Sequence, residues 1–179
     1  KFVESGDGPP PDFLLTNPKG ELHFGMEQDR ILAIYVNPEH PTIAGRTVWT
    51  IGRIVATHPG LAGIHLDHCR YPRGPFGGPG AFAKFPKAMQ TTLYTPYRWE
   101  VGEFLPTFLA RRDATVSAIV SAVSRSLPRG MVLSAAVHPT YYEERDSSDG
   151  MIKMEAWLGQ DWASWPIEYA IPMIYNTNP

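Results

Sequence analysis

The ten residues from 63 to 72, Gly-Ile-His-Leu-Asp-His-Cys-Arg-Tyr-Pro, constrain the fold of this chain more than any other segment. They begin as an apolar run, continue with ionisable side chains, and end at a proline, which cannot donate a hydrogen bond to a β-ladder. Side chains alternate along a strand, so Ile64 and Leu66 share one face. His65 and Asp67 share the other face. The pattern predicts a buried strand whose polar end opens into a site, and Asp67 is the first candidate functional residue.

The spacing of apolar residues predicts further helices and strands on both sides of this segment. Apolar residues recur every three or four positions in two stretches, which is typical of amphipathic helices. Short apolar runs bounded by prolines, glycines and asparagines are typical of strands. The predicted elements are a strand at 31–36, a helix at 42–57, a strand at 63–72, a helix that opens between 106 and 113 and ends at 127, and strands at 131–137 and 169–176.

Two long stretches show no clear periodicity. The first thirty residues contain several turn signals built from prolines and glycines, and we expect them to be loop-like. Residues 73–99 are rich in Gly, Pro, Phe and Tyr. A connection of that length is uncommon in a compact domain unless it is functional, and its aromatic content suits a sugar-binding cleft.

The order strand, helix, strand, helix, strand predicts an α/β fold with a parallel sheet. A complete (β/α)8 TIM barrel needs about 250 residues, whereas this chain has 179. We therefore expect a partial TIM barrel of about three βα units with long loops at its C-terminal face. No repeat or Gly/Ser linker divides the chain, so residues 1–179 are predicted to be a single domain. Either the sheet is open, or both ends of the barrel are missing.

Composition excludes several classes of function. The chain has a formal charge of −2 and no basic stripe, so we expect no nucleic-acid partner. No apolar run is long enough to cross a bilayer. A single cysteine excludes an internal disulfide framework and a multi-cysteine zinc site. We expect no cofactor and no bound metal, and the sequence leaves the oligomeric state open.

Six short segments, in the same order, resemble motifs of the glycosyl-hydrolase-like family 10, also called domain of unknown function 187. This family is related to the α-amylase-type barrels. The segments are IYVNPEHP at 34–41, GIHLDHCRYP at 63–72, RRDATVSAIV at 111–120, LSAAVHP at 133–139, QDWASW at 160–165 and PMIY at 172–175.

The resemblance implies a glycosidase-like TIM barrel, of which this chain is the central part, from about the third helix to the sixth strand. It implies a hydrolase of O-glycosyl bonds with a carbohydrate substrate, and it favours an extracytoplasmic or secreted bacterial protein. In the related amylase-type barrels the nucleophile is an aspartate at the end of the fourth strand, which corresponds to Asp67 here. The general acid lies at the end of the fifth strand, and no motif fixes it in this chain.

Glycoside hydrolysis usually requires two carboxyl groups, one as proton donor and one as nucleophile or base. Asp67 supplies one of them. Glu143 and Glu144 follow the strand at 131–137 and are the candidates for the second. Arg70 is placed to keep Asp67 ionised through a charge-assisted pair, whereas His68 is expected on the opposite face from Asp67. The candidate substrate-binding residues are His65, Arg70, Tyr71, His138, Tyr175 and Asn176.

Two other functions fit the same residues. The first is a metal-dependent TIM-barrel hydrolase, because His65, Asp67 and His138 stand at strand positions from which they can share a divalent ion. No further ligand stands at a recognisable spacing. The second is a non-catalytic carbohydrate-binding barrel, which needs the aromatic residues but no pair of acids. The full-length reading frame would discriminate between these hypotheses.

Overall fold

The computed structural model describes residues 11–17, 20, 24–27, 30–72, 77–78, 81, 105–139 and 158–174. The chain divides into two compact units. The first consists of Lys1–Ile43 and Pro72–Phe108, and the second of Ala44–Tyr71 and Leu109–Pro179.

The first unit contains a two-stranded antiparallel sheet. Strand β1, Phe24–Glu27, pairs with β2, Arg30–Ile34, and the register shifts between Gly25 and Met26. A short 3-10 helix, η1 at Pro11–Phe13, precedes the sheet. The prediction that residues 1–30 form only loops is therefore wrong at β1. The strand expected at 31–36 is present as β2, but its partner is an antiparallel neighbour and not a strand of the parallel sheet.

Helix α1, Pro41–Thr57, confirms the helix predicted at 42–57. Pro41 occupies the first helical position, where a missing N–H costs no hydrogen bond and the fixed φ suits the helix. Ile51 lies in the predicted apolar stripe and is buried. His58 follows the last turn, and its Nδ1 lies 3.1 Å from the carbonyl oxygen of Ile54.

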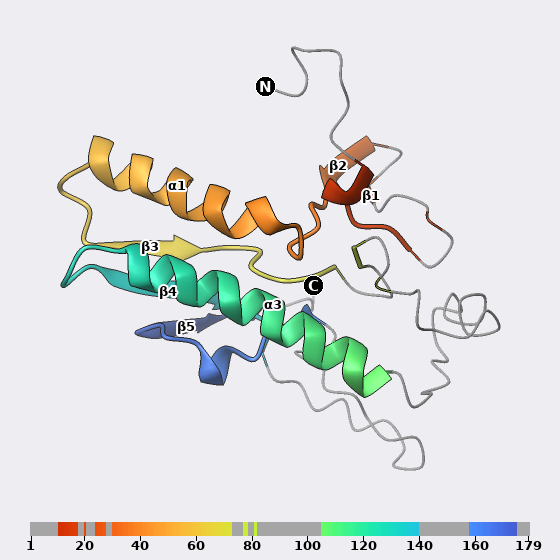
Figure 1. Cartoon of the computed structure of the whole chain (residues 1–179). Coiled ribbons are helices and arrows are strands. Elements are labelled where there is room, and N and C mark those ends of the chain that lie inside the picture. Colours follow the sequence, from red (N-terminus) through yellow and green to blue (C-terminus); the bar gives the residue numbers. More distant parts are fainter. Residues whose placement is uncertain are drawn as a thin grey trace, which may run out of the picture. The chain divides into compact units, whose positions relative to one another are not determined.

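The second unit contains a three-stranded parallel sheet (Figure 1). Its strands are β3 at Gly63–Leu66, β4 at Val132–Val137 and β5 at Tyr169–Pro172, in the order β3-β4-β5. The prediction that these strands are parallel neighbours is confirmed. The sheet is open in the part of the chain that the structure describes, so the fold is a mixed α/β arrangement, and a closed barrel is not shown.

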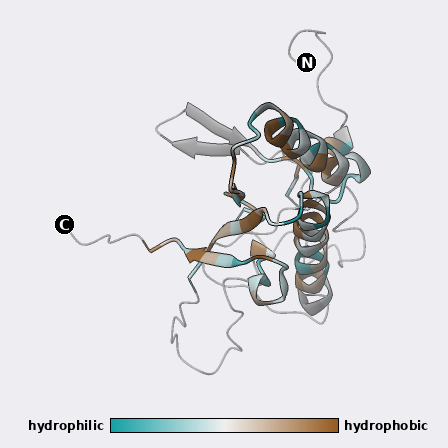
Figure 2. Ribbon diagram, turned by 90° about the vertical axis from the view of Figure 1, so that its left-hand side faces the viewer, coloured by the Kyte–Doolittle hydropathy of each residue, from teal (hydrophilic) through white to brown (hydrophobic). Residues whose placement is uncertain are grey.

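The core of the second unit lies along helix α3 and strand β4. Helix α3, Leu105–Ser126, confirms the second predicted helix, and its apolar stripe is buried. Trp165 is also buried, and its indole N–H donates a 2.9 Å hydrogen bond to the Ser117 hydroxyl on α3. Figure 2 shows apolar segments along the helices and the parallel strands. The buried apolar residues of α3 and β4 include Val116, Val120, Val123, Leu133, Ala135 and Val137.

None of the helices that the structure describes is long and apolar enough to span a membrane, in agreement with the sequence.

The backbone of β3 at Gly63 lies too close to Val132 of β4 to leave room for a side chain. A Cβ built on Gly63 would overlap the carbonyl oxygen of Val132 and lie 3.0 Å from its Cβ. We expect Gly63→Ala to lower the free energy of unfolding by about 1–3 kcal/mol, because overpacking must push paired backbones apart. Urea denaturation followed by circular dichroism measures the change. Gly60→Ala is the control, since nothing lies within 4 Å of that Cβ. Equal stability of the two variants would contradict the close approach.

Candidate functional site

Asp67 is the first residue after β3, so it stands at the carboxyl end of a strand in a parallel sheet. Its side chain is 62% exposed and so is open to solvent. His138 is the first residue after the neighbouring strand β4. Because β3 and β4 run in the same direction, both residues lie at the same edge of the sheet. The sequence predicted this juxtaposition.

His68 holds the carboxylate of Asp67. Its backbone N–H donates a 2.8 Å hydrogen bond to Asp67 Oδ1, and its Nδ1 lies 3.2 Å from the same oxygen. The expectation that His68 faces away from Asp67 is wrong. His68 has a φ of 52°, a left-handed conformation that is uncommon for a residue with a side chain. The regular alternation of side chains therefore ends at Leu66, and His68 turns back toward its neighbour.

This contact shifts the titration of Asp67. Desolvation acts to raise the pKa of Asp67, but the hydrogen bonds from the His68 side chain and backbone, together with the charges of His68 and His65, outweigh it. The pKa of Asp67 is therefore lowered from its ordinary value. Arg70, which the sequence nominated for this role, is not among the groups that lower the pKa. A carboxyl group of this kind is ionised at neutral pH and suits a nucleophile or base better than a proton donor.

His65 makes a hydrogen bond across the sheet. Its Nδ1 lies 2.9 Å from the hydroxyl of Ser134, which is its register partner on β4. Tyr169 on β5 pairs with Ser134 in turn, so the three residues form one row across the strands. His65 remains exposed, and Tyr169 is 62% exposed. The row therefore presents an imidazole and a phenol on one face of the sheet.

Gln160 ties the ends of β3 and β4 together, and sequence reasoning assigned it no role. It is fully buried. Its Oε1 accepts a 2.9 Å hydrogen bond from the His138 N–H, and its Nε2 donates to the carbonyl oxygens of Cys69 at 3.3 Å and Ala136 at 3.4 Å. Burial raises the pKa of the Cys69 thiol to about 11, so this cysteine stays protonated at neutral pH.

Tyr71 is a core residue in this structure and not an exposed cleft residue. It is 1% exposed, the Arg112 guanidinium lies 4.7 Å from its ring centroid, and its N–H donates a 2.8 Å hydrogen bond to the Leu158 carbonyl. We therefore remove Tyr71 from the candidate substrate contacts. Arg70 is partly buried, and its Nε has no hydrogen-bond partner among the described residues.

Four predicted site residues lie outside the described residues: Glu143, Glu144, Tyr175 and Asn176. The second carboxyl group of the predicted pair is among them. In the described part of the chain, no three or more His, Cys, Asp or Glu side chains are grouped so that they could hold a metal ion. The proposed set of His65, Asp67 and His138 does not form such a group.

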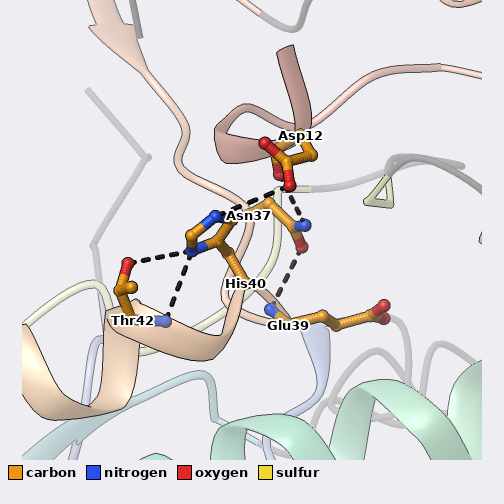
Figure 3. Close-up of polar contacts among 5 residues, drawn as sticks. All are labelled: Asp12, Asn37, Glu39, His40 and Thr42. Carbon is orange, nitrogen blue, oxygen red and sulfur yellow. Dashed lines mark hydrogen bonds and ion pairs between the residues drawn. The ribbon is translucent and has the colours of Figure 1, made fainter. Parts of the chain in front are cut away.

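A second cluster of polar residues lies in the first unit (Figure 3). Asn37 is buried, donates a 3.0 Å hydrogen bond from Nδ2 to the Asp12 carbonyl, and accepts one of 3.0 Å at Oδ1 from the Glu39 N–H. His40 Nε2 lies 3.6 Å from a carboxylate oxygen of Asp12. These contacts join η1 to the start of α1.

His40 acts as the N-terminal cap of α1. Its Nδ1 accepts a 3.3 Å hydrogen bond from the Thr42 N–H and lies 2.9 Å from the Thr42 hydroxyl. An acceptor at this position satisfies one of the free donors of the first helical turn. Carboxylate, imidazole and hydroxyl follow one another as in a proton relay, but the Thr42 N–H already occupies Nδ1. We therefore assign this cluster a structural role.

The His68 contact predicts the behaviour of His68→Asn. Asparagine tolerates a positive φ, so the variant should keep the turn and the backbone hydrogen bond while losing the imidazole. We expect the pKa of Asp67 to rise toward its ordinary value. A carbon-13 NMR titration of the Asp67 carboxyl group measures it, with His58→Asn, a change of an exposed histidine after α1, as the control. An unchanged midpoint in His68→Asn would refute the contact.

Gln160→Ala should loosen the edge that carries Asp67 and His138. The variant loses three buried hydrogen bonds to backbone groups, so we expect its free energy of unfolding to fall by about 1–3 kcal/mol. The amide of His138 should also exchange with solvent faster. Hydrogen exchange followed by NMR measures this, with Asp161→Ala at the exposed neighbouring position as the control. Unchanged protection of His138 in Gln160→Ala would show that Gln160 does not fix this strand end.

Neither family models, nor curated proteins, nor solved structures provide a match to this chain. The interpretation of the site therefore depends on the geometry of its own residues and on the six motif segments.

Proposed function

We propose that the chain carries part of the catalytic surface of a glycoside hydrolase-like TIM barrel that acts on an oligo- or polysaccharide. Asp67 is its key carboxylate, as nucleophile or base. The observation that carries the proposal is the position of an exposed aspartate at the carboxyl edge of a parallel sheet, where its carboxylate accepts a hydrogen bond from the His68 N–H. In parallel α/β barrels, this edge is where catalytic residues stand.

The neighbouring residues support a carbohydrate substrate. His65 and His138 bring hydrogen-bonding groups to the sheet at whose edge Asp67 stands, and Tyr169 adds an exposed ring in register with His65 through Ser134. Sugars are recognised through such combinations of polar groups and ring surfaces. The proton donor in this scheme is Glu143 or Glu144, the two glutamates that follow β4 in the sequence.

The reaction would divide the work between the two acids. An ionised Asp67 attacks the anomeric carbon or activates a water molecule, and it stabilises the positive charge that develops on the sugar ring. The protonated glutamate gives its proton to the leaving oxygen. His68 contributes indirectly, because its contacts lower the pKa of Asp67 and hold its carboxylate.

Asp67→Asn tests the proposal. The amide has the same shape but cannot act as nucleophile or base, so we expect kcat to fall by at least about 10³-fold with the fold unchanged. A panel of aryl glycosides and polysaccharides, with release of reducing sugar as the readout, measures the loss. Asp161→Asn is the matched control, because Asp161 is exposed and its side chain makes no capping hydrogen bond.

Two results would contradict the proposal. Hydrolysis that survives Asp67→Asn would exclude Asp67 as the catalytic carboxylate. A wild-type protein that binds the polysaccharides but hydrolyses none of the panel would instead identify a carbohydrate-binding barrel without catalysis.

A further inference from the structure

Ser134 and His65 form a side-chain hydrogen bond between β4 and β3. The two residues are register partners, and the hydroxyl oxygen of Ser134 lies 2.9 Å from Nδ1 of His65. The same hydroxyl can donate its proton to the carbonyl oxygen of Ile64, at 3.4 Å. Ser134 is half-buried, whereas His65 is exposed. The hydroxyl group therefore lies between an imidazole nitrogen and a backbone carbonyl.

These two contacts together determine which ring nitrogen of His65 carries the proton. A hydroxyl group has one proton to donate, and a carbonyl oxygen can only accept. If the Ser134 proton pointed to Nδ1, the hydroxyl oxygen and the Ile64 carbonyl oxygen would have no proton between them. Both contacts are hydrogen bonds only when Ser134 donates to Ile64 and His65 donates from Nδ1. In a neutral imidazole, Nε2 then keeps the free lone pair.

We propose that Ser134 is a positioning residue, which holds neutral His65 with its proton on Nδ1 and so makes Nε2 an acceptor for a hydroxyl group of the substrate. No hydrogen-bond partner of Nε2 occurs among the residues that the structure describes. A sugar hydroxyl has a proton to give to this nitrogen, whereas a carboxylate has none. The choice of a sugar rests on the proposed function, but the position of the proton on His65 does not.

His65 belongs to the strand that leads to Asp67. It lies two residues before Asp67, and it is close enough for its charge to contribute to the lowered pKa of that carboxyl group. An ionised carboxylate is only an acceptor, as is Nε2 of His65 in this tautomer. Both side chains therefore need a donor from the ligand, and a neutral sugar offers hydroxyl donors at neighbouring positions. The substrate is then a sugar unit that presents a free hydroxyl to His65.

The first test is nitrogen-15 NMR of the imidazole rings in the whole chain, at about pH 8.5, where a histidine of ordinary pKa is neutral. We expect the proton of His65 on Nδ1, although a histidine ring free in water prefers Nε2. Two histidines calibrate the spectrum. Nδ1 of His138 lies 2.9 Å from the Pro139 carbonyl oxygen and donates to it, whereas Nδ1 of His40 accepts from the Thr42 N–H. An Nε2 proton on His65 in the wild type would overturn the inference.

Substitutions of Ser134 separate positioning from packing. Ser134→Ala removes the hydroxyl group, so we expect the proton of His65 to return mainly to Nε2. Ser134→Thr keeps a hydroxyl group and should keep the proton on Nδ1. Ser164→Ala is the matched control, because Ser164 is exposed and its hydroxyl donates to the Asp161 carbonyl. The same His65 tautomer in Ser134→Ala as in the wild type would contradict the positioning role, with circular dichroism to verify the fold.

The second test concerns the substrate. Neutral gluco-, xylo- and galacto-oligosaccharides are added to Asp67→Asn, which should not consume them. We expect at least one of them to shift the Nε2 resonance of His65, and the further change Ser134→Ala to raise its Kd by about three- to tenfold, as for one lost hydrogen bond. No shift with any of these sugars, or an unchanged Kd, would overturn the role in substrate binding.

Failure of the proposed function can be recognised separately. Hydrolysis that survives Asp67→Asn would exclude Asp67 as the catalytic carboxylate, but it would not move the proton of His65. Conversely, a proton on Nε2 of His65 would exclude the positioning role of Ser134 and leave the loss of hydrolysis in Asp67→Asn unchanged.

Discussion

The parallel pairing of β3 with β4 is the interaction on which the candidate site depends. It brings together segments that are 69 residues apart at the His65–Ser134 hydrogen bond, and it sets the register that leaves Asp67 and His138 at one edge. The pairing is tight because Gly63 has no side chain to hold Val132 away. Gln160 then joins the loop after β3 to the end of β4 through three backbone hydrogen bonds. This connection is rigid, because breaking any of these hydrogen bonds would leave a buried polar group without a hydrogen-bond partner.

The turn after β3 gives this edge its chemistry. His68 adopts a positive φ and so donates its backbone N–H, and brings its imidazole, to the carboxylate one residue earlier. Backbone strain of this kind persists only where the surroundings impose it, and it is found most often at functional sites. Here it lowers the pKa of an exposed carboxylate without an arginine. The contact forms between two adjacent residues, whereas the position of the Asp67 carboxylate is set by the sheet.

The sequence predicted the regular elements well because their signals are local. The stripe of apolar residues and Pro41 defined α1, and an apolar run closed by a proline located β3. The strand predicted at 63–72 nevertheless ends at Leu66, and none of the residues of β3 is buried, contrary to the expectation of a buried strand. Strand β1 was missed, since Phe-Gly-Met-Glu has a glycine and little intrinsic strand preference, and its conformation depends on pairing with β2. Closure into a barrel remains a prediction, because the described strands form an open sheet.

The site was predictable only as far as the regular strand extends. Alternation of side chains predicted that His65 and Asp67 share one face and that His68 lies on the other. The prediction for His68 is wrong, because the strand ends at Leu66 and side chains do not alternate beyond it. Gln160 is distant in sequence from the strand ends that it joins, and no local sequence pattern predicts that this glutamine is buried. The burial of Tyr71 beneath Arg112 is likewise a tertiary effect.

In the proposed function, the carboxylate held by His68 is the one that performs catalysis. The most direct measurement is the pH dependence of kcat/KM for a hydrolysed glycoside, in the wild type and in His68→Asn. The acid limb reports the pKa of the essential base in the free enzyme. We expect this limb to move to higher pH in His68→Asn, because the variant loses the imidazole that lowers the pKa of Asp67. An acid limb that stays in place while the pKa of Asp67 rises would contradict the claim.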